Sequence, residues 1–193
     1  MYRQHSKKQL WSENGKEPSC RLQSESESAM KLETDDMHWS GLTLSERRIL
    51  RATFEKMESD SATNGSSVFV RLLTEFPNYA TLWPQFGVMR SSELSKSGVL
   101  ERHALLFMRG LGTIVRALDE DDGGRHFRKY LATVGAVHRV KGVRAFHLQH
   151  MLPTVLATLK FCLEALTPDA ERAWTKLFQL LVQPLCVEES DSL

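Results

Sequence analysis

A chain of 193 residues with 41% hydrophobic residues, 25% charged residues and a net charge of +1 has the composition and length of one ordinary globular domain. The near-neutral balance gives no support for binding to nucleic acid or to a membrane surface, and no stretch reaches the roughly 18 apolar residues of a membrane-spanning helix. A secretory signal and a myristoylation glycine are both missing, and three scattered cysteines argue against a disulfide framework or a zinc site, so we expect a cytoplasmic protein.

Residues 1–42 differ in composition from the rest of the chain. They are rich in Ser, Glu, Lys and Gln, and their apolar residues are too few and too irregular to bury a core. We therefore expect a disordered N-terminal extension over 1–42, an ordered domain over 43–186 and a short C-terminal tail over 187–193.

The ordered part is predicted to begin with two helices. Thr43 and Glu46 have the spacing of a capping box, and an amphipathic stripe continues from them to about Ser59. The sequence Asn64-Gly65-Ser66 is expected to interrupt the helical pattern. A second helix then ends near Phe76, because Pro77 disfavours a helical conformation in the residue before it.

An aromatic segment and a long helix come next. Tyr79, Trp83, Pro84 and Phe86 lie within a few residues of each other in a connection, which suggests a loop packed over something large. After a polar link over 87–97, a helix is expected over 98–118. The apolar stripe of this helix includes a histidine; its members are Leu100, His103, Phe107, Leu111, Ile114 and Leu118.

Three further helices complete the prediction. The first, over 125–139, carries another histidine on its apolar stripe of Phe127, Leu131, Val134 and His138. A long apolar helix is expected over 146–166. The last helix begins after Thr167, with Pro168 at its first position, and stops by Pro184. Since no segment shows the alternation of a β-strand, the predicted fold class is all-α.

The two histidines on apolar stripes are either ordinary core residues or ligands of a metal cofactor. Each could be an ordinary hydrogen-bonded core residue. The stripes carry no carboxylate or thiol that would complete a tetrahedral zinc site. Two imidazoles in an aromatic, apolar slot suit a flat and largely hydrophobic cofactor such as haem better than a bare ion.

The segment 43–186 resembles the globin family over nearly its whole length. The similarity lies in an ordered series of motifs: Leu72-Leu-Thr-Glu-Phe-Pro77, Leu82-Trp-Pro-Gln-Phe86, Glu101-Arg-His103-Ala and Leu131-x-x-x-Gly135-x-x-His138-Arg-x-x-Gly142-Val143. The last motif is the most specific, and it resembles neuroglobin-like globins more closely than myoglobins. The resemblance implies a three-on-three helical sandwich that holds haem b. N-terminal extensions like 1–42 are common among invertebrate globins.

The resemblance also implies a role for each matching residue. His138 matches the proximal ligand of the haem iron, His103 the distal histidine and Val143 a residue packed on the haem edge. Further pocket-lining residues are Phe69, Trp83, Phe86 and Phe107. One departure from the family pattern is that its haem-stacking Phe appears here as Trp83, so either Trp83 or Phe86 makes that contact.

Several functions follow from this resemblance. The first is reversible binding or sensing of dioxygen, CO or NO, with electron transfer and a bis-histidine, six-coordinate haem. The second is a haem redox enzyme, a nitric oxide dioxygenase or nitrite reductase, which needs an external reductant. A haem-free regulatory module is the third. A redox partner or a homodimer stays open as a further interaction.

Overall fold

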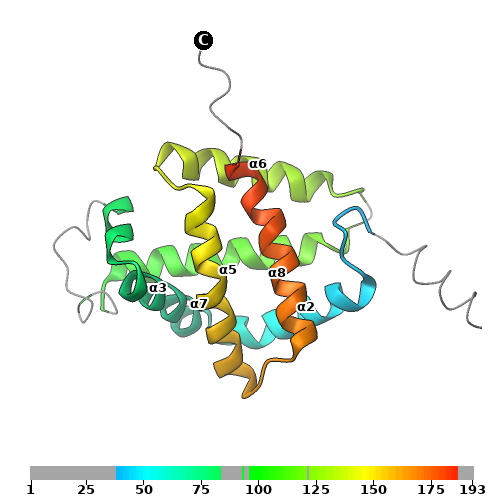
Figure 1. Cartoon of the computed structure of the whole chain (residues 1–193), viewed down its shortest axis with the longest axis horizontal. Coiled ribbons are helices and arrows are strands. Elements are labelled where there is room, and N and C mark those ends of the chain that lie inside the picture. The colour runs from blue at the N-terminus through cyan, green and yellow to red at the C-terminus, as the bar shows by residue number, and fades with distance from the viewer. Residues whose placement is uncertain (1–37, 84–92, 94–95, 121, 187–193) are drawn as a thin grey trace, which may run out of the picture. The chain divides into compact units, whose positions relative to one another are not determined.

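A computed structural model describes residues 38–83, 93, 96–120 and 122–186 of the chain (Figure 1). Within these residues the secondary structure is helical and contains no strand, so the all-α prediction is confirmed. In chain order the elements are α2 (Leu44–Glu58), α3 (Ser61–Glu75), the 3-10 helix η1 (Pro77–Leu82), α5 (Gly98–Ala117), α6 (Arg125–Val140), α7 (Ala145–Leu163), α8 (Pro168–Val182) and the 3-10 helix η3 (Gln183–Leu185).

The six α-helices of the described residues form two layers of three. One layer holds α2, α5 and α6, and the other holds α3, α7 and α8; α3 packs across onto α5, and α2 packs across onto α7 and α8. Figure 1 shows α6 along one edge, beside the start of α7 and the end of α8. The core between the layers is largely apolar and includes Trp174, whose buried indole N–H donates to the Thr53 hydroxyl at 3.0 Å.

Local signals place the helix starts where the sequence predicts them. The Thr43 hydroxyl accepts from the Glu46 backbone N–H at 3.2 Å, and the Glu46 carboxylate accepts from the Thr43 N–H at 2.9 Å, which completes the capping box of α2. At the start of α8 the Thr167 hydroxyl accepts from the Ala170 N–H, with Pro168 at the first position. These caps need only neighbouring residues, so the sequence alone locates them.

The predicted break at Asn64-Gly65-Ser66 is wrong, because α3 runs through it from Ser61 to Glu75. Asn64 is buried, and its side-chain amide donates to the Met57 carbonyl at 2.9 Å. A Cβ added at Gly65 would lie 2.8 Å from Met108 Cγ and 3.0 Å from the Ala104 carbonyl oxygen. The glycine therefore serves the close approach of α3 and α5 and does not mark a turn.

The close approach of α3 and α5 predicts that adding a methyl group at Gly65 destabilises the protein. Gly65→Ala should lower the free energy of unfolding by about 1–2 kcal/mol, since overpacking against the α5 backbone outweighs the helix propensity of alanine. Gly98→Ala is the matched control, because a Cβ there meets only Arg102, at 3.9 Å. Urea unfolding followed by circular dichroism compares the two variants. A Gly65→Ala protein as stable as the control would contradict the packing role.

Packing begins a few residues before the capping box. Leu42 is fully buried, and the Trp39 ring lies on Phe127 of α6 with the ring centroids 4.8 Å apart. The same indole covers Gly124, which precedes α6 with a φ of +76°, so that a side chain at Gly124 would collide with the tryptophan. Residues 1–37 and 187–193 are outside the described residues, and the division of the chain at 42 and 186 stays a prediction.

Candidate functional site

The candidate site is organised around His103 on α5. Its imidazole meets Phe69 of α3 edge to face at a centroid distance of 4.9 Å, and Trp83, directly after η1, at 5.0 Å. Phe69 in turn contacts Trp83 at 6.0 Å and Phe107 at 5.4 Å, again with nearly perpendicular rings. Perpendicular arrangements of this kind are favourable for aromatic rings. Four of the predicted site residues therefore form one aromatic cluster.

The position of each ring follows from its helix. Phe69 lies on the buried face of α3 and is 1% exposed, so it is the most deeply buried ring of the cluster. His103 and Phe107 are one turn apart on α5 and share a face of that helix. Trp83 reaches the same place because η1 ends at Leu82 and the chain becomes extended at Trp83. His103, Phe107 and Trp83 are only half-buried, and this remaining surface can pack against a ligand.

His138 lies near the end of α6 and is also half-buried. Its Nδ1 atom is 2.8 Å from the Val134 carbonyl oxygen, one turn earlier in the same helix. A carbonyl oxygen only accepts hydrogen bonds, so Nδ1 carries the proton and donates it. The lone pair of a neutral His138 is then on Nε2, which makes this atom the available metal ligand.

The end of α6 is closed tightly behind His138. The Val143 N–H donates to the His138 carbonyl at 3.0 Å, and Gly142 has a φ of +82°, which is the left-handed conformation of a helix C-terminus. The motif Gly142-Val143 thus ends the helix and holds Val143 close to His138 in the fold. Val143 is half-buried. Phe86 lies outside the described residues, so its predicted contact stays a prediction.

The two histidines influence each other electrostatically. Burial, and secondly the neighbouring His138, lower the pKa of His103 to about 4. The His103 imidazole is therefore neutral at pH 7 and can offer a lone pair to a metal. The neutral His103 imidazole on α5, beside its aromatic rings, and the Nε2 atom of His138 on α6 could together hold a planar metal cofactor.

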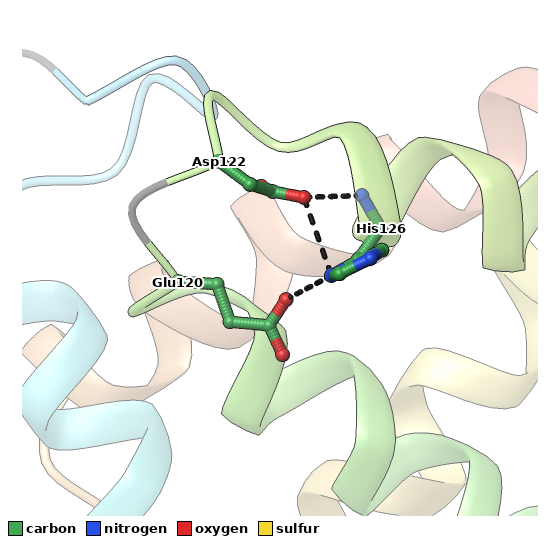
Figure 2. Close-up of side chains that lie close together, drawn as sticks. All are labelled: Glu120, Asp122 and His126. Carbon is green, nitrogen blue, oxygen red and sulfur yellow. Dashed lines mark hydrogen bonds and ion pairs between the residues drawn. The ribbon is translucent and has the colours of Figure 1, made fainter.

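A second group of metal-binding side chain types lies elsewhere, and the sequence interpretation missed it. Among the described residues, Glu120, Asp122 and His126 form the only group of three His, Cys, Asp or Glu side chains with ligand atoms close together (Figure 2). His126 Nδ1 is 2.8 Å from Glu120 and 3.4 Å from Asp122. Asp122 also accepts from the backbone N–H groups of Gly124, Arg125 and His126, so it caps α6. Glu120 and His126 are exposed and Asp122 is half-buried, and the group includes neither His103 nor His138.

Three other histidines, His126, His147 and His150, make surface or structural contacts. His126 is exposed in the cluster just described. His150 stacks on Phe76 at a centroid distance of 4.2 Å, and its Nδ1 is 2.5 Å from the Tyr79 hydroxyl. His147 lies against Tyr79 and accepts from the Arg144 N–H. The contacts of His147 and His150 join η1 to the start of α7. None of them involves His103 or His138.

Comparison with known proteins supports the same reading of the sequence. A family model described as Globin matches residues 66–185. Cytoglobin-1 of Oryzias latipes is 27% identical over 143 residues, which cover 72% of this chain and 79% of that protein. This match agrees with the resemblance predicted for 43–186.

Solved structures match the arrangement of the helices. A hexa-coordinate hemoglobin of Drosophila melanogaster, studied for cyanide binding and haem cavity transitions, has a TM-score of 0.69 at 17% identity and covers 75% of this chain and 93% of its own. A hexacoordinated haem protein from an anhydrobiotic tardigrade has a TM-score of 0.66 at 20% identity, with 75% and 92% covered. At these identities the likeness establishes the fold, and the predicted three-on-three sandwich is confirmed.

Proposed function

Because the chain belongs to the globin family, we propose that it binds haem between α5 and α6, with His138 as the proximal and His103 as the distal ligand of the iron. When bound, haem supplies an iron that binds diatomic gases and changes its oxidation state. The sequence contains no Cys-x-x-Cys-His motif for covalent attachment, which supports haem b held by ligation and packing alone.

The hydrogen bond of His138 is the observation that carries this proposal. The Val134 carbonyl fixes the proton on Nδ1, 2.8 Å away, and so orients the ring with Nε2 free. Such a partner on the second nitrogen is typical of histidines that ligate metals, because it sets the tautomer and raises the basicity of the ligand. A core histidine needs a hydrogen bond too, but His138 also lies near enough to His103 to contribute to the lowering of its pKa.

The aromatic cluster supports a role for His103 as the second ligand. Its pKa of about 4 keeps it neutral at physiological pH, and the edges of Phe69 and Trp83 restrict its rotation. Phe107 should narrow the pocket on the His103 side of the haem, because its ring packs on Phe69. The hexa-coordinate haem proteins of Drosophila and of the tardigrade have the same fold, which agrees with a six-coordinate resting state.

The function that follows is reversible binding or sensing of dioxygen, CO or NO, together with electron transfer from an external donor. If His103 is the second ligand of the iron, a gas would bind only in molecules whose His103 imidazole has moved away. An open fraction of about 1% would lower the apparent gas affinity about 100-fold, which suits sensing or redox chemistry better than oxygen storage. The free Cys162 and Cys186 thiols are compatible with the reducing cytoplasm that we propose as its location.

Visible spectroscopy of the full-length protein tests the proposal. After haem addition we expect a Soret band, and after reduction without ligand we expect the sharp bands of a six-coordinate haem. Adding CO should replace them with the spectrum of a CO complex. Broad five-coordinate bands in the reduced protein would contradict the role of His103, and a missing Soret band would contradict haem binding altogether.

A further inference from the structure

The solvent-exposed face of α6 carries basic and aliphatic side chains that take no part in the proposed haem site. We propose that this face, with the turn that follows it, docks the protein on an anionic membrane surface. The proposal does not depend on haem binding, since it concerns the side of α6 that faces away from His138. No helix among the described residues is long and apolar enough to cross a membrane, so the association is peripheral.

Positive charge is concentrated on this helix. Between Gly123 and Leu163 the sequence has seven Lys or Arg residues and no Asp or Glu, which the net charge of +1 for the whole chain conceals. Six of the seven lie on α6 or in the turn after it: Arg125, Arg128, Lys129, Arg139, Lys141 and Arg144. All but Arg139 are exposed. A cluster of exposed Lys and Arg residues of this kind favours attachment to anionic lipid headgroups.

Grooves on both sides leave α6 as a ridge. One groove of about 450 Å³ lies between Leu131 on α6 and the end of α8 with η3, where Leu180 and Pro184 line it. The other, of about 390 Å³, lies between Thr133 on α6 and Ala117 on α5. The exposed face of α6 between the two grooves is the part that we propose to touch the membrane surface.

Apolar side chains lie among the basic ones on the ridge. Val137 is 57% exposed and Val140 is 86% exposed, and Ala132 and Ala136 on the same face are exposed as well. Water contact with such side chains is unfavourable, and the boundary between headgroups and acyl chains would accept them. The phosphate backbone of a nucleic acid offers no apolar layer for these valines. The mixture of charged and aliphatic groups therefore favours a lipid surface.

Among the described residues, two acidic side chains are hydrogen-bonded to the beginning of the ridge. Glu120 pairs with His126, and Asp122 accepts from the first backbone N–H groups of α6 (Figure 2). Both carboxylates thus face the helix start, where they also favour the positive end of the helix dipole. The positive charges from Lys129 to Arg144 have no acidic residue between them in the sequence.

Vesicle binding by the full-length protein tests the proposal. The probes are vesicles of phosphatidylcholine alone and vesicles with about 30% phosphatidylserine, compared by sedimentation at low and high salt. We expect binding only to the anionic vesicles, and weaker binding at high salt. Lys129→Gln with Lys141→Gln should weaken it about 25-fold, at about five-fold for each charge.

Two further arms make the result specific. Lys56→Gln with Lys160→Gln removes the same charge from exposed positions on α2 and α7 and should leave binding unchanged. Val140→Ser should weaken vesicle binding about five-fold, since it removes the most exposed aliphatic side chain of the ridge. Circular dichroism of every variant verifies that it is folded.

Each other outcome overturns the proposal. Equal binding to both kinds of vesicle, or an equal loss in both double variants, would show attachment that α6 does not direct. Absence of binding to anionic vesicles would show that α6 does not dock on an anionic membrane. If poly-glutamate binds to the ridge under those conditions, with the same loss in Lys129→Gln/Lys141→Gln, the partner is an acidic protein instead.

Discussion

Replacing His138 by alanine should abolish stable haem binding by the full-length protein. The variant loses the ligand whose tautomer is set by the 2.8 Å hydrogen bond to the Val134 carbonyl. Loss of an outer-shell partner alone typically costs 10–100-fold in metal affinity, so loss of the ligand should exceed about 100-fold. Titration of the apoprotein with haem, followed at the Soret band, measures the affinity.

His126→Ala is the matched control for this experiment. His126 is on the same helix, but its side chain is 75% exposed and pairs with Glu120. We expect it to bind haem as the wild-type protein does. A His138→Gly variant should regain its Soret band when free imidazole is added, because the ligand is then supplied from solution. Unchanged haem affinity in His138→Ala, with circular dichroism showing a folded protein, would disprove the assignment of the proximal ligand.

Replacing His103 by leucine should convert the reduced, ligand-free spectrum from six-coordinate to five-coordinate. The substitution removes the imidazole that competes with external gases and leaves Phe69, Trp83 and Phe107 in place. If the open fraction of the wild-type protein is about 1%, the CO affinity should rise about 100-fold, since no internal ligand must leave first. Spectroscopy of the reduced protein and CO titration give the two readouts.

The same variant separates the two resting states of the iron. A wild-type spectrum that is already five-coordinate, and that His103→Leu does not alter, would contradict bis-histidine ligation while leaving haem binding intact. His126→Leu again serves as the control, because it alters an exposed histidine on α6. Haem retention in His103→Leu also distinguishes a distal role from a proximal one, since loss of His138 should release the cofactor.

The helix face that carries His138 could be predicted from its neighbours in the sequence. The intervals between Phe127, Leu131, Val134 and His138 place them on one helix face, and in the structure Phe127 and Leu131 are buried and the other two half-buried. The hydrogen bond from His138 to Val134 is itself a contact within one turn of the helix. The neutral state of His103 was beyond sequence reasoning, because it depends on burial by other helices and on His138.

The role of Gly65 shows why part of the fold could not be predicted. Asn64-Gly65-Ser66 has the composition of a turn, and nothing within a few residues contradicts that interpretation. The helix continues because Met108 and Ala104 of α5 pack where a Cβ would be. Likewise, the place of Trp39 on Gly124 and Phe127 is set by partners more than eighty residues away.

The sequence by itself determined the all-α class, the capped starts of α2 and α8 and the helix faces that carry His103 and His138. These features depend on hydrogen bonds and periodicities that span only a few residues. Only the tertiary structure decided that Phe69, Trp83 and Phe107 gather with His103, that α3 passes through Gly65, and that α6 stands as a basic ridge between two grooves. Those features depend on contacts between helices, whose distances and directions no local pattern of residues specifies.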